Sequence, residues 1–358
     1  MKTNLLYISP NFNYACGVSK HVFINLKHLS DNPDYALYFI TNGGDSLDRL
    51  SQKKNLNIKL FNFKKDHKNV FYLIRDSVQL YLFCKKNKIN IIHTHHRYAE
   101  LLSVIVSKFY KLKTITTAHS FVEGLKRISF RSDKIICVSN SVKQHITKNY
   151  PHSKNKLEQI YNCIDDDFIA SAQAFSTKCP MKIKNDYTKI LFVGKNNPIK
   201  GLDVLIKSMH KLSIHYKLKL IVIGLEKSEI LKDQIIYSDN IEFEGVQNNL
   251  IKYYQECDIV VIPSRIDSFP YVMLEAAIMQ KPIIAANTGG LGEFISNDID
   301  GILFDVGNAD ELAKKIEFII DKYDNALLMA EKLYSKVKEA CNCKSYFEKL
   351  HALYVQFL

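Results

Sequence analysis

The chain has 358 residues, 47% of them hydrophobic and 24% charged, which is typical of a soluble globular protein large enough for two domains. Its apolar runs are shorter than the roughly 18 to 20 residues of a membrane-spanning helix, and residues 1–10 lack the apolar stretch of a signal peptide, so we expect a cytoplasmic protein. Residues 1–170 carry 26 Lys and Arg against 13 Asp and Glu, whereas the rest has 23 against 24, so the excess positive charge predicts an anionic surface or ligand for the first half.

Short apolar runs alternate with longer amphipathic ones through the first half. The expected strands are Asn4–Ser9, Tyr35–Thr41, Ile58–Phe63, Ile89–Thr94, Lys113–Ala118 and Lys134–Ser139. The expected helices are Lys20–Ser30, Asn69–Lys86, Ala99–Tyr110 and one that begins at Ser141. This alternation predicts a parallel, doubly wound sheet with helices on both faces.

The periodicity fades between Asp165 and Lys189, where we expect the domain linker, and then resumes. The expected strands are Lys189–Val193, Leu218–Ile223, Ile241–Glu244, Ile259–Pro263 and Pro282–Ala286. The expected helices are Gly201–Leu212, Leu250–Cys257, Val272–Met279, Ala309–Ile320 and the amphipathic Lys344–Phe357. We therefore predict an α/β chain of two Rossmann-like domains, 1–170 and 171–343, that face a central cleft.

Ligands of open α/β sheets bind beyond the carboxyl ends of the strands, and two glycine-containing loops are expected there. Asn11–Lys20 has Gly17 just before a helix, where a backbone can approach a diphosphate; a plain strand-to-helix turn has the same composition. This loop lacks the GxGxxG of dinucleotide-binding dehydrogenases. In Gly194–Gly201, Lys195 and Lys200 are either solvated or neutralise diphosphate oxygens.

The stretch from Pro263 to Ala277 is the most informative of the chain. Asp267 lies in a loop after a strand, and residues 268–271, apart from Pro270, present backbone N–H groups where a helix begins. Glu275 follows about one turn into that helix, where its carboxylate can accept hydrogen bonds from vicinal hydroxyls. The downstream Gly289-Gly290 completes a frame that favours a sugar-nucleotide site.

Histidines near strand ends admit more than one interpretation. His119 directly follows an expected strand and is either structural or a hydrogen-bonding or acid–base group of the site. His93, His95 and His96 suggest a metal site, but only His93 and His95 share a strand face, without Cys, Asp or Glu at ligand spacing. The eight cysteines are scattered without a C-x-x-C motif, so we expect reduced thiols. Because the histidines also lack ligand spacing, we expect no metal or other cofactor.

These segments together resemble the retaining glycosyltransferases of family 4, which have the GT-B fold. The G-R-x-x-x-x-K-G loop of that family is similar to Gly194–Gly201, with Lys195 in the place of the arginine. The family's paired acids with seven residues between them are similar to Asp267 and Glu275. Further similar elements are Phe269-Pro270, Ser139–Ser141 and Ile160–Asp165.

The resemblance implies a role for each matching donor-side residue. Lys195 and Lys200 would hold the donor diphosphate and stabilise the leaving nucleoside diphosphate. Glu275 would bind the ribose of the nucleotide. The residues that would address the donor sugar, partly through backbone amides, are Asp267, Phe269, Pro270 and Tyr271.

The resemblance also implies roles outside that segment. His119 would contact the sugar near the reacting centre and would form the catalytic set with Asp267 and Lys200. Gly17 would let its loop close on the phosphates, and the last helix, 344–358, would return to pack on the N-terminal domain. No metal is implied, because lysines and helix dipoles supply the electrostatic stabilisation. Asp267 is shorter than the glutamate of the family, so the choice of donor sugar is least determined there.

We therefore expect a retaining glycosyltransferase that moves a sugar from a nucleoside-diphosphate sugar to a hydroxyl of a surface-glycan acceptor. A lipid-linked glycan of the O-antigen, capsule or lipopolysaccharide type fits the basic first half, which is the acceptor half in this family. The basic clusters there are Lys64, Lys65, Lys68, Lys85, Lys86, Lys88, Lys108, Lys111, Lys113, Lys126, Arg127 and Arg131.

These basic residues suit a peripheral position on the inner face of the plasma membrane. The apolar residues of Asn69–Phe83 either add a docking face or pack on the sheet. Two other functions stay open: a noncatalytic binding protein with this fold, and a GT-B nucleotide-sugar epimerase. Nucleic acid is not an expected partner, because the basic clusters lack a known binding motif.

Overall fold

The computed structural model describes residues 2–51, 53–63, 69–176, 187–226 and 240–357. The chain forms two compact units: unit 1 comprises Met1–Tyr161 with Phe347–Leu358, and unit 2 comprises Asn162–Tyr346. The predicted division at 170/171 falls inside a helix, α5 (Asp166–Ser176), which also occupies part of the expected linker. The rest of that linker up to residue 186, and Lys64, Lys65 and Lys68, lie outside the described residues.

Unit 1 is built on a parallel sheet of seven strands in the order β3-β2-β1-β4-β5-β6-β7. These strands are β1 (Thr3–Ile8), β2 (Tyr35–Thr41), β3 (Leu56–Leu60), β4 (Ile91–Thr94), β5 (Lys113–Ala118), β6 (Lys134–Cys137) and β7 (Leu157–Gln159). The helices are α1 (Gly17–Ser30), α2 (Val70–Lys86), α3 (Arg97–Ser107), α4 (Asn140–Asn149) and, from Phe347 onward, α12 (Cys343–Val355).

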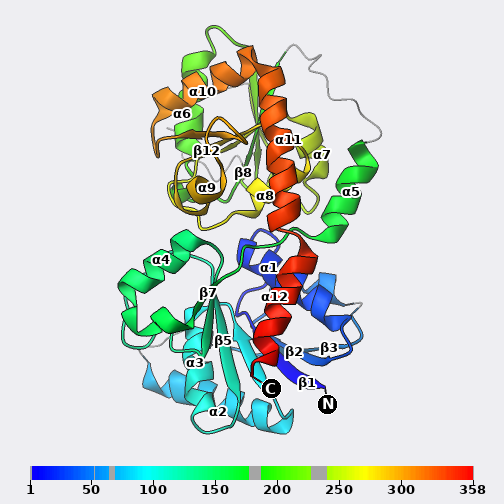
Figure 1. Ribbon diagram of the computed structural model, residues 1–358, viewed down its shortest axis with the longest axis vertical. Coiled ribbons are helices and arrows are strands. Elements are labelled where there is room, and N and C mark those ends of the chain that lie inside the picture. The colour runs from blue at the N-terminus through cyan, green and yellow to red at the C-terminus, as the bar shows by residue number, and fades with distance from the viewer. Residues whose placement is uncertain (1, 52, 64–68, 177–186, 227–239, 358) are drawn as a thin grey trace. The chain divides into compact units, whose positions relative to one another are not determined.

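The central strand β1 shows why this sheet carries helices on both faces. Leu6 and Ile8 point into a cluster with Leu80 of α2 and Leu102 of α3. Tyr7 points to the opposite face, where its hydroxyl donates to Oδ1 of Asn25 in α1 at 3.2 Å and lies 2.6 Å from the hydroxyl of Tyr354 in α12. Because helices cover both faces of the sheet (Figure 1), residues 5–8 of the strand are all apolar rather than alternating with polar residues.

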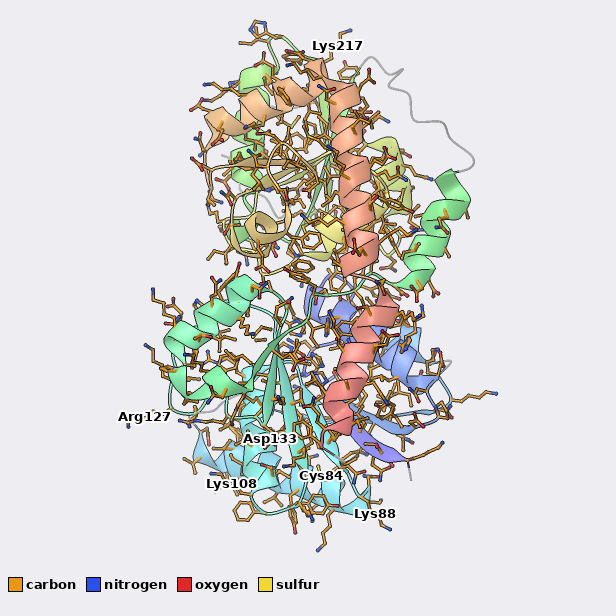
Figure 2. All side chains as sticks on the ribbon, viewed as in Figure 1. Cys84, Lys88, Lys108, Arg127, Asp133 and Lys217 are labelled. Atoms are coloured by element: carbon orange, nitrogen blue, oxygen red, sulfur yellow. The ribbon has the colours of Figure 1, made fainter. Side chains whose placement is uncertain are left out.

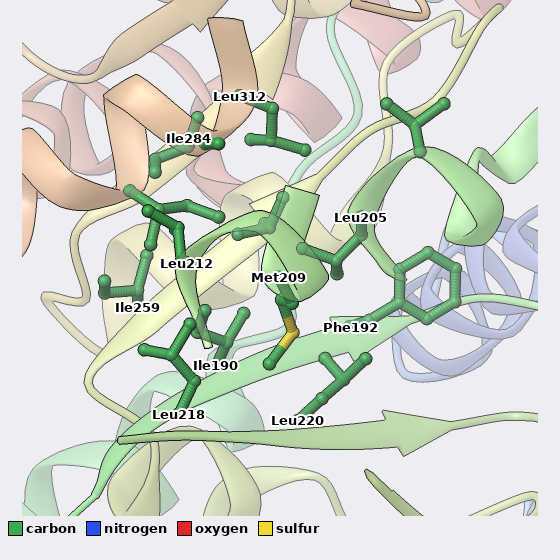
Figure 3. Close-up of a cluster of buried hydrophobic side chains, with 14 of the residues drawn as sticks. Ile190, Phe192, Leu205, Met209, Leu212, Leu218, Leu220, Ile259, Ile284 and Leu312 are labelled. Carbon is green, nitrogen blue, oxygen red and sulfur yellow. The ribbon is translucent and has the colours of Figure 1, made fainter. Parts of the chain in front are cut away.

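Unit 2 has a parallel sheet of six strands in the order β10-β9-β8-β11-β12-β13. These are β8 (Thr188–Val193), β9 (Leu218–Ile223), β10 (Ile241–Phe243), β11 (Ile259–Ile262), β12 (Ile283–Ala286) and β13 (Ile302–Phe304). Its helices after α5 are α6 (Leu202–Leu212), α7 (Ile251–Glu256), α8 (Tyr271–Ile278), α9 (Gly289–Phe294), α10 (Ala309–Asp321) and α11 (Tyr323–Ala340). Figure 3 shows how Leu205, Met209 and Leu212 of α6 pack over Ile190, Leu220 and Ile259 of the sheet.

Most of the expected helices and strands are present in the structure. The observed elements that were not expected are short or have a weak hydrophobic pattern in the sequence. The strand β7 is short and only half-buried, and β13 has three residues. The long helix α11 buries Ala326, Ala330, Leu333 and Val337. Two of these four are alanines, which give the buried stripe of a helix little hydrophobic contrast.

Helix α2 exposes apolar side chains along one side, so packing on the sheet accounts for only some of the apolar residues of Asn69–Phe83. Leu80 and Cys84 pack on the sheet as one interpretation predicts. Five others are between 51% and 69% exposed, and we call them the α2 stripe: Val70, Phe71, Ile74, Val78 and Leu82. Within the described ranges, no helix has both the length and the apolar character needed to cross a bilayer.

Candidate functional site

The loop after β8 is shaped by Asn197 and Gly201. The Asn197 side chain accepts a hydrogen bond from the Ile199 N–H at 2.9 Å and starts a 3-10 turn over Pro198–Lys200. Gly201 then takes the left-handed conformation with φ of 72°, and a Cβ there would lie 2.0 Å from the Pro263 carbonyl oxygen. Only glycine allows this approach, so the loop lies directly against the end of β11.

Arg265 joins this loop to the one after β11. Its backbone N–H donates to the Ile199 carbonyl at 2.7 Å, and its guanidinium donates to the Pro198 carbonyl at 2.5 Å. The guanidinium also donates to both carboxylate oxygens of Asp203, at 2.8 and 2.7 Å. These hydrogen bonds from Arg265 lower the pKa of Asp203. Sequence reasoning missed this pair, because its members are 62 residues apart and belong to no motif.

The predicted residues Lys200 and Asp267 meet within unit 2. The Lys200 ammonium lies 2.7 Å from Oδ2 of Asp267, and the Ser264 hydroxyl donates to the same oxygen at 3.1 Å. Asp267 is 10% exposed and Lys200 34% exposed, so the pair borders solvent. Lys195 is exposed on the same loop, and its side chain makes no hydrogen bond or ion pair with any residue that the structure describes.

The downstream glycines hold the Asp267 loop from the other side. The Gly290 N–H donates to the Asp267 carbonyl at 3.0 Å. A Cβ on Gly290 would lie 2.0 Å from the Ser268 carbonyl oxygen, so this approach also requires glycine. The carboxylate of Asp267 is therefore placed by contacts to its side chain and to its backbone.

Glu275 and the aromatic residues near it are buried in unit 2. The Tyr254 hydroxyl donates to Oε2 of Glu275 at 2.7 Å, and burial together with this carboxylate raises the pKa of Tyr254 well above its usual value. Phe269 packs edge-on against Phe294, with ring centroids 5.2 Å apart. Tyr271 is also buried, so the Phe269 and Tyr271 side chains anchor the start of α8, and Pro270 precedes the helix without a side-chain cap.

His119 in unit 1 belongs to a group of histidines rather than standing alone. Its Nε2 lies 3.0 Å from Nδ1 of His95, which follows the neighbouring strand β4. The His21 ring of α1 lies edge-on to it, with centroids 4.7 Å apart. Burial, and secondarily the neighbouring imidazoles, lower the pKa values of His95 and His119 well below the usual value. His119 is therefore a neutral hydrogen-bonding group at physiological pH.

The histidines that lie together in the structure are not the set His93, His95 and His96 that the sequence suggested as a metal site. His93 binds the Tyr354 hydroxyl at 2.7 Å and the Tyr7 hydroxyl at 3.2 Å through Nδ1, and the Thr117 hydroxyl at 2.8 Å through Nε2. Both of its nitrogens are engaged, so it is a structural group that ties α12 to the sheet. The rings that converge with His95 are His21 and His119. His21 was missed because it lies in a predicted helix far from both in sequence.

Gly17 is the first residue of α1 and is exposed. The loop before it is held by the Asn13 N–H, which donates to the Ser19 hydroxyl at 3.0 Å, and by the Tyr14 N–H, which donates to Asp45 at 2.8 Å. The structure thus places Gly17 at the carboxyl edge of the sheet of unit 1, as predicted from its position after β1.

Comparison with known families decides what this chain is. Residues 15–168 match Glycosyltransferase Family 4, and residues 178–339 match Glycosyl transferases group 1. The chain belongs to the group 1 glycosyltransferases. The two matched segments fall largely in unit 1 and unit 2, respectively, so the family accounts for both halves.

Two relatives of this glycosyltransferase illustrate the range of the likeness. It is 26% identical over 334 residues to an uncharacterized glycosyltransferase of Methanocaldococcus jannaschii, covering 88% of each chain. It is 27% identical over 277 residues to a 41.2 kDa protein in the cps region of Klebsiella pneumoniae, covering 72% of this chain and 74% of that one.

Solved structures share the fold of this glycosyltransferase over nearly its whole length. A glycosyltransferase of Rickettsia africae has a TM-score of 0.81 at 23% identity, with 99% and 98% of the two chains covered. Anabaena HepE, solved with UDP-glucose, has a TM-score of 0.80 at 15% identity, with 99% of each covered. The lipopolysaccharide outer core galactosyltransferase WaaB has a TM-score of 0.76 at 14% identity, with 99% and 100% covered. The predicted two-domain α/β GT-B fold is confirmed.

Proposed function

We propose that this glycosyltransferase moves a sugar from a nucleoside-diphosphate sugar to a hydroxyl of a lipid-linked surface glycan, with retention at the anomeric carbon. The structure of HepE with UDP-glucose supports a donor of this class. The Klebsiella relative in the cps region and the lipopolysaccharide galactosyltransferase WaaB support a glycan acceptor of the capsule, O-antigen or lipopolysaccharide type.

The observation that carries the proposal is the contact between Lys200 and Asp267. Cleavage of the bond between sugar and diphosphate leaves negative charge on the diphosphate, and a cation already in place stabilises that charge without reorganisation. Lys200 is held 2.7 Å from Asp267 and reaches solvent, while the exposed Lys195 supplies a second positive charge on the same loop. A diphosphate bound by Lys200 leaves the Asp267 carboxylate, oriented by Ser264, able to accept hydrogen bonds from sugar hydroxyls.

Lys200→Ala tests this assignment. Removal of one preorganised donor to a developing charge lowers turnover by about 10²–10³-fold, so we expect a loss of that size in kcat/KM for release of the nucleoside diphosphate. Lys217→Ala is the matched control, because Lys217 is exposed at the amino end of β9, on the opposite edge of the same sheet (Figure 2). Candidate donors are first ranked by the thermal stabilisation that each gives to the wild type.

Two further readouts separate this function from its alternatives. The anomeric configuration of the product, read by NMR, should match that of the donor, and an inverted product would contradict retention. Donor alone should not be epimerised. If Lys200→Ala turned over donor as fast as the wild type, the diphosphate role of this loop would be wrong.

The proposal includes attachment to an anionic membrane through unit 1. The α2 stripe extends about 18 Å along the helix, at 1.5 Å per residue. Its five apolar side chains are each roughly half exposed, so their burial in lipid contributes about 1 kcal/mol apiece. The single acid of α2, Asp76, is buried, so the outer side of this helix presents no negative charge.

Basic residues border the α2 stripe and make the surface complementary to anionic lipid. Lys85 and Lys86 end α2, and Lys88 and Lys108 lie at the edge of unit 1 that carries this helix (Figure 2). Each lysine near an anionic surface contributes about 1 kcal/mol. The apolar and the electrostatic contributions therefore act on one side of unit 1, which suits a helix lying in the membrane surface.

Vesicle sedimentation tests this attachment. We expect the wild type to sediment with vesicles containing phosphatidylglycerol and not with neutral phosphatidylcholine vesicles. The double variant Val78→Glu/Leu82→Glu should lose most of this binding. Ile214→Glu, which changes an 82% exposed apolar residue of unit 2, should not lose it. Equal binding to both kinds of vesicle, or full binding by the double variant, would contradict the membrane part while leaving sugar transfer untouched.

A further inference from the structure

Three histidines from separate elements of unit 1 converge on one point. His21 comes from the buried side of α1, His95 follows β4, and His119 follows β5. Their nearest ring nitrogens all lie within 4.8 Å of one another. Because β4 and β5 are adjacent and parallel, the residues that follow them emerge side by side, and α1 supplies the third ring from the covering layer.

One nitrogen of this cluster is buried without a partner. Nδ1 of His95 faces Nε2 of His119 at 3.0 Å, and that contact is satisfied by one shared proton. Nε2 of His95 is buried, and no group in the described part of the chain forms a hydrogen bond with it. An unpaired buried nitrogen costs about 1–3 kcal/mol, so the arrangement is incomplete as a hydrogen-bonded core.

The surroundings keep the His95 ring in place for a ligand. His93 stacks on it with centroids 4.6 Å apart and planes inclined by 26°, and Tyr7 stacks at 5.3 Å and 25°. His93 has both nitrogens engaged and so serves as support rather than as a fourth nitrogen donor. Burial disfavours the charged forms of His95 and His119 and lowers the pKa values of both imidazoles, which leaves their nitrogens available as neutral ligands.

We propose that His21, His95 and His119 bind one divalent transition-metal ion of the zinc type. Neutral imidazoles are preferred ligands of Zn²⁺, Ni²⁺, Co²⁺ and Cu²⁺, whereas Mg²⁺ and Ca²⁺ require oxygen ligands. Zinc–nitrogen bonds of about 2.1 Å place tetrahedral ligand atoms roughly 3.4 Å apart. With Nδ1 of His95 and Nε2 of His119 as ligands, this 3.0 Å pair needs to open by a few tenths of an ångström, and the widest pair, within 4.8 Å, needs to close by up to about 1.4 Å. The unpaired Nε2 of His95 is not a ligand in this arrangement.

A metal ion in this place acts on the proposed reaction. Three imidazoles leave a fourth position for water or for an oxygen of a ligand. The bound ion fixes the His119 ring through the nitrogen that faces His95, so the ring cannot turn to offer this nitrogen to the donor sugar, which is the contact that the family resemblance implies. Zinc is therefore an inhibitor of sugar transfer. This second step rests on the proposed function, whereas metal binding itself does not.

Metal binding is measured on the full-length, chelator-treated protein without a histidine tag and without donor or acceptor. We expect one Zn²⁺ per chain by competition with a chromophoric chelator, and no displacement by Mg²⁺. His95→Gln and His119→Gln should each weaken binding by at least about 100-fold, since loss of even an outer-shell partner of a zinc ligand costs 10–100-fold. His215→Gln, on the exposed surface of unit 2, is the control and should bind as the wild type does.

Each result bears on one step. A wild type that binds no zinc, or variants at 95 and 119 that bind it unchanged, would overturn the metal site. His119 is less buried than His95, so His119→Gln decides the question if His95→Gln does not fold, as judged by circular dichroism. Zinc should also lower donor turnover, and a chelator should restore it. Binding that leaves turnover unchanged would refute the inhibitory step alone, and failure of Lys200→Ala to lose activity would bear on the proposed function alone.

Discussion

Gly201→Ala tests whether the loop after β8 truly depends on its close approach to β11. The substitution places a Cβ 2.0 Å from the Pro263 carbonyl oxygen, a separation that no ordinary contact tolerates. It also forces a non-glycine residue to φ of 72°, which costs about 1–2 kcal/mol. Displacement of packed backbone adds about 1–3 kcal/mol, so we expect unit 2 to lose roughly 3 kcal/mol of stability.

Gly307→Ala separates these two contributions. Gly307 lies in the same unit with a similar φ of 80°, but a Cβ there would meet open space. It should therefore show only the conformational cost of about 1–2 kcal/mol. Because both glycines belong to unit 2, both variants shift the same unfolding transition.

Differential scanning calorimetry provides the comparison. One kcal/mol corresponds to roughly 2–4 °C for a domain of this size, so the Tm of Gly201→Ala should lie several degrees below that of Gly307→Ala. Gly201→Ala should also slow release of the nucleoside diphosphate, because it moves the adjacent Lys200, whereas Gly307→Ala should not. Equal Tm values for the two variants would refute the argument from the Pro263 contact.

Three other changes have defined outcomes. Arg265 lowers the pKa of Asp203, so this partly exposed pair contributes up to about 1 kcal/mol of stability at pH values above the unfolded pKa of about 3.9. That stability is lost as the pH falls through the lower pKa of the folded state. In urea unfolding near pH 6 and near pH 3, Asp203→Asn should therefore lose less free energy of unfolding at the acidic pH than the wild type does. Glu100→Ala removes the acceptor of three backbone N–H groups, so the free energy of unfolding of unit 1 should fall by about 3 kcal/mol in urea titrations. Glu123→Ala, at a more exposed site, is the control and should lower it by less than about 0.5 kcal/mol. Tyr354→Phe removes a hydroxyl shared by two buried partners and should lower the Tm of unit 1 by an amount equivalent to about 1–3 kcal/mol; an unchanged Tm would contradict a structural role for this network.

The sequence predicts the parts of this site that follow from strand order. Lys200 and Asp267 both lie just past apolar runs, and parallel neighbouring strands end at one edge, so their meeting is foreseeable. The pairing of Arg265 with Asp203 is not foreseeable from the sequence, because a long surface side chain can reach many partners and only the folded loops determine which of them lies near it. The contacts of His21 could not be predicted for a similar reason. Its position in the helix predicts which side of α1 it lies on, but not which loops that side packs against.

Burial shows the same limit of sequence reasoning in α2. The periodicity of residues 70–86 predicts a helix, and it predicts which side chains share a face. It does not predict how much of the apolar circumference the sheet covers, because that depends on the neighbouring helix and strands. Leu80 is fully buried, whereas Leu82, two residues later, is 58% exposed.

The return of α12 to unit 1 determines how this protein can be dissected. Unit 2 is one continuous piece of chain, Asn162–Tyr346, and could be produced as an isolated fragment for donor-binding studies. Unit 1 is discontinuous, and a fragment ending at Tyr161 would lack the Tyr354 hydroxyl and leave His93 and Tyr7 without their shared buried partner. An isolated unit 1 therefore needs an engineered linker that joins residue 161 to residue 347, or coexpression of the final helix as a separate peptide.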